Sequence, residues 1–199
     1  SALCVRDYLL ATAANAAAQT DALGLGEPEN TVVNLLTWSE QFANAAWLKT
    51  NATITPNSIA GPNGLLTAAK LTRVATVGTE ASAVQTCPPI SAGTNLDWAI
   101  YVKAGSAGAL LGLRIIYVDS TVPTGIVTFD PSAGTIVFTG TSFTGKASIV
   151  PDVNGWYRCS ISAAAVASPV ASRIDIDVTT STTGGLGGNA GDFIYITEA

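Results

Sequence analysis

Three segments of the chain alternate apolar and polar residues with a period of two. These segments are 96–103, 156–163 and 174–178. In the first, Trp98, Ile100 and Val102 share one face, and polar residues take most of the other. Because successive side chains of a strand point to opposite faces, this period predicts half-buried β-strands. Further strand candidates are 110–118, 125–130, 135–139, 143–150 and 193–196.

Turn residues separate these strand candidates at short intervals. The segment Pro131-Ser132-Ala133-Gly134 joins 125–130 to 135–139 and predicts a hairpin. The chain shows no internal repeat and no alternation of strands with helices that would indicate a parallel sheet. The pattern therefore predicts an all-β domain over 34–199, an antiparallel β-sandwich (jelly roll) of two sheets packed face to face.

Residues 1 to about 23 have a different character. The segment from Asp7 to Ala18 has high helix propensity without Gly or Pro, and Gly24 offers a C-terminal stop. We therefore predict a short N-terminal α-helical arm and linker over residues 1–33. Its small apolar side chains would let another backbone approach closely, so we expect the arm to dock a partner; a helix that lies on its own domain is the alternative. The expected docking residues are Leu9, Leu10, Ala13 and Ala17.

Charge and hydropathy exclude several classes of function. The net charge is −5, and the nine basic residues are scattered instead of forming the basic stripe that nucleic acid requires. No apolar run reaches the ~20 residues of a transmembrane helix. We also expect no signal peptide, because Arg6 and Asp7 interrupt the apolar run near the N-terminus, and we expect Ser1 to follow a removed initiator Met.

Residue types limit the catalytic chemistry that we expect. The chain has no histidine, which excludes Ser-His-Asp and Cys-His catalysis and His-ligated zinc. The glycine-rich segment 184–188 lacks the lysine and the following helix of a nucleotide-binding loop, so we interpret it as a surface loop. Asp175 and Asp177 could act as a pair in glycan hydrolysis, since alternate strand positions share a face about 6.6 Å apart. We prefer the interpretation of a solvated strand face and predict a binding protein, not an enzyme.

Few residues suggest a cofactor or a covalent link. Asp192 is a candidate ligand for a structural calcium ion, but calcium needs about six to eight oxygen ligands, and a turn aspartate is the simpler interpretation. We expect no other cofactor. Cys4, Cys87 and Cys159 lack metal-ligand spacing. We expect Cys159 to be a buried free thiol, with a Cys87–Cys159 disulfide as the alternative.

Sugar binding would need exposed aromatic side chains. Trp98 and Trp156 stand in alternating strands, where we expect burial. Tyr101, in contrast, shares the polar face of its strand with Lys103. The candidate carbohydrate-binding residues are Tyr101, Tyr117 and Trp38.

An ordered series of short motifs runs from residue 34 to residue 196. It opens with Asn34-Leu35-Leu36 and continues through Ser39-Glu40, Phe42, Asn44 and Trp47. Its later members are Pro62-Asn63-Gly64, Ala69-Lys70-Leu71, Tyr101-Val102-Lys103-Ala104-Gly105, Asn154-Gly155-Trp156-Tyr157-Arg158 and Gly191-Asp192-Phe193-Ile194-Tyr195-Ile196. On physical grounds we expect Phe42 and Trp47 to form a hydrophobic plug and Asn154-Gly155 to form a tight turn. The series resembles a carbohydrate-binding-module-like jelly-roll domain of bacteriophage virion and tail-associated proteins.

This resemblance implies a virion structural protein that acts by protein–protein binding. Because the chain would be one such domain behind a short arm, we expect a capsid-decoration, head-fibre or cement component, assembled in the host cytoplasm and located on the virion. The expected partners are the major capsid protein or tail components, and the expected assembly is a homotrimer. The alternative is a carbohydrate-binding, host-recognition module of a tail fibre or adhesion device, with a surface glycan as its ligand. We expect neither a nucleic acid nor a membrane partner.

Overall fold

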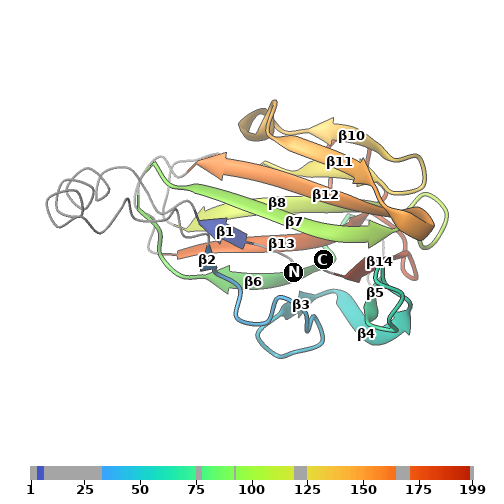
Figure 1. Cartoon of the computed structure of the whole chain (residues 1–199). Helices are drawn as coiled ribbons and strands as arrows, with labels where there is room; N and C mark the ends of the chain where they lie inside the picture. Colours follow the sequence, from blue (N-terminus) through green and yellow to red (C-terminus); the bar gives the residue numbers. More distant parts are fainter. Residues whose placement is uncertain are drawn as a thin grey trace, which may run out of the picture.

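The fold is a sandwich of two antiparallel sheets (Figure 1). The computed structural model describes residues 4–6, 33–74, 78–91, 93–118, 125–164 and 171–197. Within these ranges, no helix is long and apolar enough to cross a membrane. The prediction of an all-β antiparallel sandwich is confirmed.

The first sheet has eight strands. Six of them lie in the spatial order β11 (Ala147–Pro151), β12 (Trp156–Ala164), β7 (Asn95–Lys103), β14 (Phe193–Thr197), β5 (Ala68–Arg73) and β4 (Ala52–Ile59). The other two are β1 (Cys4–Arg6) and β2 (Val33–Asn34). Two of the segments with a period of two are β7 and β12, and these strands pair along their whole length.

The second sheet has six strands. Their spatial order is β10 (Thr135–Thr139), β9 (Val127–Asp130), β8 (Leu110–Val118), β13 (Ala171–Thr179), β6 (Ser82–Cys87) and β3 (Leu48–Thr50). The predicted hairpin is β9–β10. The third period-two segment is β13, which lies inside the sheet between β8 and β6. Two single turns of 3-10 helix, η1 (Thr141–Phe143) and η2 (Val153–Gly155), flank β11.

The chain begins with a strand where we predicted a helix. Cys4–Arg6 pairs with Leu96–Trp98 of β7 on one side and with β2 on the other. Within β7, the described part of β14 pairs with Tyr101–Lys103 and not with the first half of the strand. That first half therefore has an edge whose backbone groups need a partner, and β1 supplies it. The helix prediction is therefore wrong for Cys4–Arg6.

The rest of the expected arm lies outside the described residues. These include the expected docking residues Leu9, Leu10, Ala13 and Ala17. The helix over that segment, its docking role and the division into 1–33 and 34–199 stay predictions.

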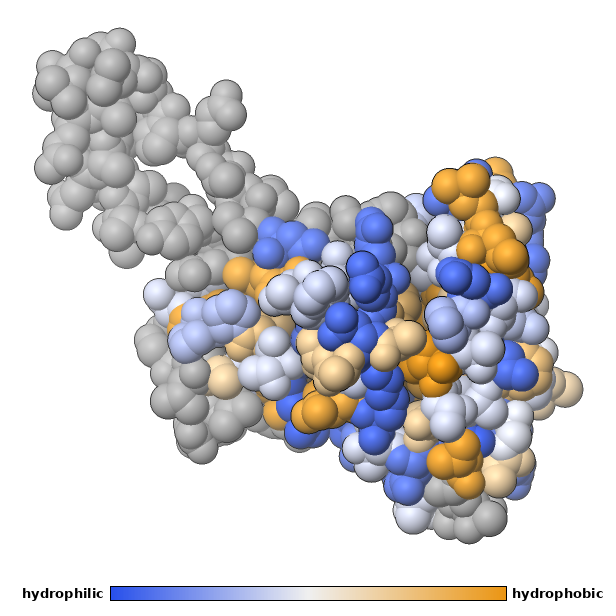
Figure 2. All heavy atoms as spheres, turned by 90° about the horizontal axis from the view of Figure 1, so that it is seen from below, coloured by the Kyte–Doolittle hydropathy of each residue, from blue (hydrophilic) through white to orange (hydrophobic). Residues whose placement is uncertain are grey.

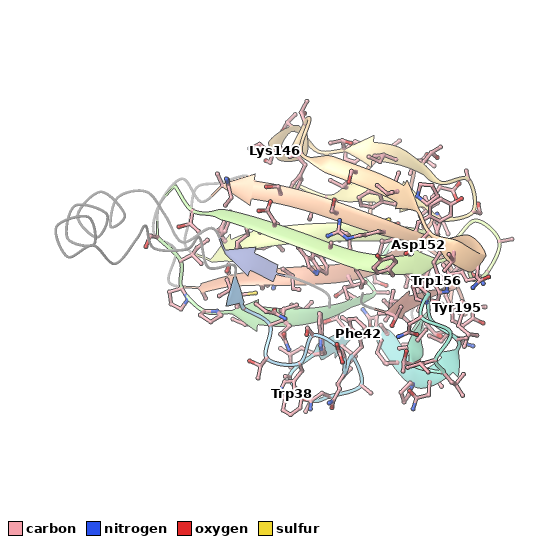
Figure 3. All side chains as sticks on the ribbon, viewed as in Figure 1. Trp38, Phe42, Lys146, Asp152, Trp156 and Tyr195 are labelled. Carbon is pink, nitrogen blue, oxygen red and sulfur yellow. The ribbon has the colours of Figure 1, made fainter. Side chains whose placement is uncertain are left out.

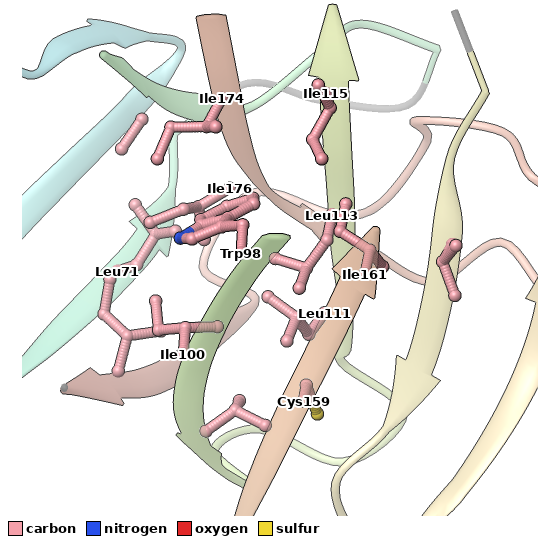
Figure 4. Close-up of a cluster of buried hydrophobic side chains, with 14 of the residues drawn as sticks. Leu71, Trp98, Ile100, Leu111, Leu113, Ile115, Cys159, Ile161, Ile174 and Ile176 are labelled. Carbon is pink, nitrogen blue, oxygen red and sulfur yellow. The ribbon is translucent and has the colours of Figure 1, made fainter. Parts of the chain in front are cut away.

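The hydrophobic core fills the space between the two sheets. Its residues come from the inward faces of both, as Figure 4 shows for Trp98, Leu113, Ile161 and Ile176. Each of these side chains is almost fully buried. Burial of apolar area on this scale is the main force that holds the sheets together.

One open side of the core is closed by the turn that leads into β3. Phe42 and Trp47 are both buried, and their rings lie 5.1 Å apart. The indole N–H of Trp47 donates to the carbonyl of Trp38 at 2.8 Å. The expected hydrophobic plug is confirmed.

A tight turn connects β11 to β12, as the sequence predicted. Asn154 and Gly155 both adopt left-handed backbone conformations, with φ of 58° and 76°. Asn and Gly are the residues that accept this conformation most readily. The turn delivers Trp156 to the start of β12 with its side chain fully buried, which also confirms that expectation.

Some large apolar side chains remain exposed. They are Trp38, Leu48, Leu65, Leu66, Val74, Val150 and Val153. On the face shown in Figure 2, apolar residues form several separate groups with polar residues between them. That face therefore presents no single continuous apolar surface.

Candidate binding groove

A groove crosses the outer face of the first sheet over β7, β12 and β11. It is an open cavity of about 380 Å³, here called the outer groove. Its lining includes Ala99 and the polar residues Asp97, Lys146, Ser148, Arg158, Ser160 and Ser162. The groove therefore faces away from the core, which takes the alternate side chains of the same strands.

The hollow exists because short side chains meet across three strands. The strand register places Ser148, Ser160 and Ala99 in one row, from β11 through β12 to β7. The hydroxyl oxygens of Ser148 and Ser160 lie 2.8 Å apart. Since none of these side chains extends more than two heavy atoms beyond Cα, the row forms a low floor.

Two longer side chains flank this row, one on each side of it along the strand direction. Lys146 lies beside Ser162, whose backbone N–H donates to the Lys146 carbonyl at 2.8 Å. Arg158 lies four residues before Ser162 along β12, which corresponds to about 13 Å in an extended strand. Figure 3 shows Lys146 near one end of the β11–β12 pair and Asp152 near the other. The groove is thus a polar hollow with a cationic residue on each side of its row of small side chains.

Tyr101 lies on the same outer face, beside Arg158. The two residues are directly paired between β7 and β12, so their side chains share the outer face. Burial raises the pKa of Tyr101, and the negative charge of Asp152, with the hydrogen bond that this carboxylate accepts from the phenol, raises it further. The Asp152 carboxylate therefore lies close enough to the Tyr101 phenol to act on its ionisation.

Trp38 lies apart from this site. Its side chain is 38% exposed on the turn before β3. Figure 3 places it well away from Lys146 and Asp152. The structure therefore does not bring Trp38 and Tyr101 together into one sugar site.

Tyr117 is not a surface residue. Its side chain is 5% exposed and belongs to the core, and its hydroxyl donates to the Ala163 carbonyl at 2.8 Å. A ring buried between the sheets cannot stack on a sugar, so the assignment of Tyr117 to a carbohydrate site is wrong. The sequence held a signal for this: Tyr117 is two residues beyond Ile115 and four beyond Leu113, on the apolar face of β8.

The opposite outer face of the sandwich holds a buried cluster of charges. Asp175 and Asp177 are both 0% exposed, so the expected solvated strand face is wrong. Arg114 of β8 is their common partner. Its Nη2 contacts two carboxylates, at 2.9 Å from Asp175 Oδ2 and 2.5 Å from Glu80 Oε1. Its Nε lies 2.9 Å from Asp177 Oδ2. Arg173 adds a second contact to Asp175 at 3.2 Å.

Burial dominates the ionisation of these two aspartates. It raises the pKa of Asp177 to about 7, although Arg114 opposes the shift. It also raises the pKa of Asp175 against the opposing charges of Arg114 and Arg173. Glycan hydrolysis requires two carboxylates on either side of a sugar bond. Both of these carboxylates are closed off from solvent and bound to Arg114, an arrangement that suits an ion-pair network better than a hydrolytic site.

The glycine-rich segment is a loop held by a buried arginine. Arg73 is fully buried, and its guanidinium donates to the carbonyls of Val178 and Leu186, each at 2.9 Å, and to that of Thr79. Backbone carbonyls that would otherwise be buried without a partner are satisfied in this way. The surface-loop interpretation of 184–188 is consistent with this arrangement.

Asp192 belongs to the turn that follows this loop. Its carboxylate accepts a hydrogen bond from the Asn189 N–H at 2.6 Å. In the part of the chain that the structure describes, no group of three His, Cys, Asp or Glu residues is placed to hold a metal ion. The calcium assignment of Asp192 stays an untested prediction.

Cys87 and Cys159 are both buried, and no disulfide joins them. The alternative of a disulfide between them is wrong, and the interpretation of Cys159 as a buried thiol is confirmed. Burial raises the pKa of the Cys159 thiol, which keeps it protonated and unreactive.

The chain has little similarity to known proteins. No family model matches the chain, and no curated protein matches it. One similar solved structure contains the CBM22-1 and GH10 modules of endo-1,4-β-D-xylanase 10B from Clostridium thermocellum, complexed with xylohexaose. It shares 15% identity over 77% of this chain and 26% of the xylanase chain, with a TM-score of 0.41. The chain thus spans about a quarter of the length of that structure, and a likeness at this level does not establish a common function.

Proposed function

We propose that this chain is a non-catalytic binding domain that holds a carbohydrate in the outer groove. The observation that carries the proposal is the composition of this one face: serine hydroxyls on the floor, charged groups at the ends and a tyrosine ring beside them. Sugars present hydroxyl groups along their edges and apolar C–H faces, so they bind where polar groups lie beside an aromatic ring. The three strands that carry these groups are paired throughout, so the site is formed in advance on a rigid surface.

The same face argues for binding over hydrolysis. Asp97 is the one carboxylate among the described residues that line the groove. Asp152 lies beyond Tyr101, whose phenol its carboxylate engages. A hydrolytic site would need a second carboxylate free to act across the sugar bond from the first.

A blocking substitution tests the proposal. We expect Ser160→Tyr to fill the groove floor and to abolish saccharide binding that the unchanged protein shows on an array of diverse glycans. Thr86→Tyr is the matched control, since it adds a tyrosine to an exposed position of β6 in the other sheet. Binding that survives Ser160→Tyr would place the site elsewhere, and the absence of binding to every glycan would reject a carbohydrate function.

The ordered motifs of the sequence support a second proposal, a structural role in a bacteriophage virion. In this proposal the chain is a capsid-decoration or head-fibre component that assembles as a homotrimer on the major capsid protein, or a host-recognition module in a tail. The support is the resemblance of residues 34–196 to domains of virion proteins. Mass spectrometry of purified particles tests it through copy number: hundreds of copies per particle indicate decoration, a few indicate a tail, and absence rejects the role. A glycan-binding groove is compatible with either location.

A further inference from the structure

Among the residues whose side chains the structure describes, the basic ones contact other groups of the protein, except for the two that line the outer groove. Eight of the nine basic residues have described side chains. Three of the eight bind carboxylates or buried backbone carbonyls: Arg73, Arg114 and Arg173. Three more are lysines that bind exposed carbonyls or lie over an aromatic ring: Lys49, Lys70 and Lys103.

The remaining two are Lys146 and Arg158, and both line the groove. Among the described residues, neither side chain has a hydrogen bond or an ion pair, and both side chains are exposed. Asp97 is the one acidic lining residue, so the lining carries a charge of two minus one, or +1, in a chain whose net charge is −5. Beyond the lining, Asp152 near Tyr101 and Lys103 two residues along β7 add one charge of each sign and leave this sum unchanged. A local surplus of positive charge on an acidic protein attracts an anionic group, because charges farther away than the Debye length of about 8 Å are screened at physiological salt.

From this distribution we propose that the outer groove selects acidic saccharides, with Arg158 binding the carboxylate or sulfate of a sugar that lies against Tyr101. This inference rests on the proposed carbohydrate function. Arg158 is the direct cross-strand partner of Tyr101, so a substituent of a sugar on the tyrosine would lie next to the guanidinium. A guanidinium can donate two parallel hydrogen bonds to a carboxylate or sulfate, which gives it an advantage over a neutral donor.

Lys146 provides the second contact of the proposed ligand. Its backbone lies about 13 Å from that of Arg158 along the sheet, a separation longer than one sugar ring. The spacing therefore suits a chain of sugars with more than one acidic group, in which successive acidic sugars meet Arg158 and Lys146. The hydroxyls of Ser160 and Ser162 lie between these two contacts and can bond to the sugar hydroxyls.

Calorimetric titration with three probes of similar length tests the inference. The probes are an oligogalacturonate, the same oligosaccharide after reduction of its carboxylates to alcohols, and a sulfated oligosaccharide. We expect at least one acidic probe to bind, and we expect its binding to weaken as the salt concentration increases. If carboxylate is the group recognised, the reduced probe should bind about tenfold or more weakly than the oligogalacturonate. The comparison between the two acidic probes shows whether carboxylate or sulfate is preferred.

Two variants connect the result to the groove. Arg158→Gln keeps a polar side chain at an exposed position, and we expect it to lower the affinity for the acidic probe about tenfold or more and the affinity for neutral saccharides by a clearly smaller factor. Lys49→Gln is the control, because Lys49 is a lysine of β3 in the other sheet; we expect no change. Equal binding of reduced and acidic probes, with no effect of Arg158→Gln, would overturn acidic selectivity and leave the carbohydrate function in place. Failure of all glycans, neutral and acidic, would overturn both.

Discussion

The buried charge cluster of the second sheet makes Arg114→Met the most informative single substitution for the fold. Methionine has about the length of the arginine stem and fills its space without the charge. The substitution leaves Asp177 without its cation and leaves Asp175 with Arg173 alone, while Glu80 loses its contact as well. Removing one partner of a buried ion pair costs about 3–5 kcal/mol, because the remaining charge has neither water nor a counter-ion. For a domain of this size the loss lowers the melting temperature by roughly 6–20 °C.

The loss of stability caused by Arg114→Met should depend on pH in a definite direction. An aspartate in the unfolded chain has a pKa of about 3.9, whereas that of Asp177 in the folded protein is raised to about 7. At a pH between these two pKa values, Asp177 is protonated in the folded state and ionised in the unfolded state. The contribution of Asp177 to stability therefore falls as pH rises from about 4 to about 7 and is constant above about pH 7. Loss of Arg114 raises the folded-state pKa further. We therefore expect the substitution to reduce stability more at pH 8 than at pH 5.

Urea denaturation of both proteins at pH 5 and pH 8 measures this difference. The double variant Arg114→Met with Asp177→Asn is the control, and we expect it to recover part of the loss at pH 8 because one unpaired carboxylate has been removed. A loss of less than about 1 kcal/mol at pH 8, or a larger loss at pH 5 than at pH 8, would show that the cluster does not bear on stability as the geometry implies.

Three further substitutions or probes follow from the structure. Arg73→Met should lower the free energy of unfolding by about 3 kcal/mol or more, because it removes the Arg73 donors from the carbonyls of Val178 and Leu186. Urea denaturation and the rate of proteolysis in the glycine-rich loop measure this loss, and wild-type values in both assays would contradict it. Gly134→Ala should destabilise the β9–β10 hairpin by about 1–3 kcal/mol, since an added Cβ would lie 2.6 Å from the Tyr157 ring at a residue with φ of 68°; a neutral thermal melt would argue against that close approach. Neither Cys87 nor Cys159 should react with a thiol reagent until the protein unfolds, because both are buried; fast labelling of either thiol in the native protein would be inconsistent with the core as described.

Much of the sandwich could be predicted because its strands have the simplest pattern. In β7 and β12 one face is apolar and the other polar, so the period of two shows directly in the sequence. The short strands near the start of the domain were harder. β4 contains Pro56 and a left-handed Asn57, and it lies at an edge of its sheet, where such residues are tolerated but disguise the pattern.

The charge cluster shows where the pattern misleads. β13 alternates, but it lies inside its sheet, and the polar side chains of its outer face are enclosed by Arg114 from a strand more than 60 residues away in the chain. Alternation identifies two faces and does not show whether the polar face meets water. The expectation of solvated carboxylates failed for this reason.

The outer groove could not be read from the sequence either. Its floor depends on Ala99, Ser148 and Ser160 lying in one row, and that row exists only after β7, β12 and β11 pair in their observed order and register. No local motif surrounds these small residues. Tyr101 was the one groove-side residue that alternation singled out, because it shares a polar face with Lys103.

Amide chemical shifts offer the most direct test that the outer groove is the binding surface. The labelled protein would be titrated with the oligosaccharide that binds best on the glycan array, and shift changes would be mapped onto the strands. We predict the largest changes at Ala99, Ser148, Ser160 and their neighbours in β7, β11 and β12. Changes confined to the Trp38 turn or to the outer face of β13 and β8 would contradict a binding site on this sheet.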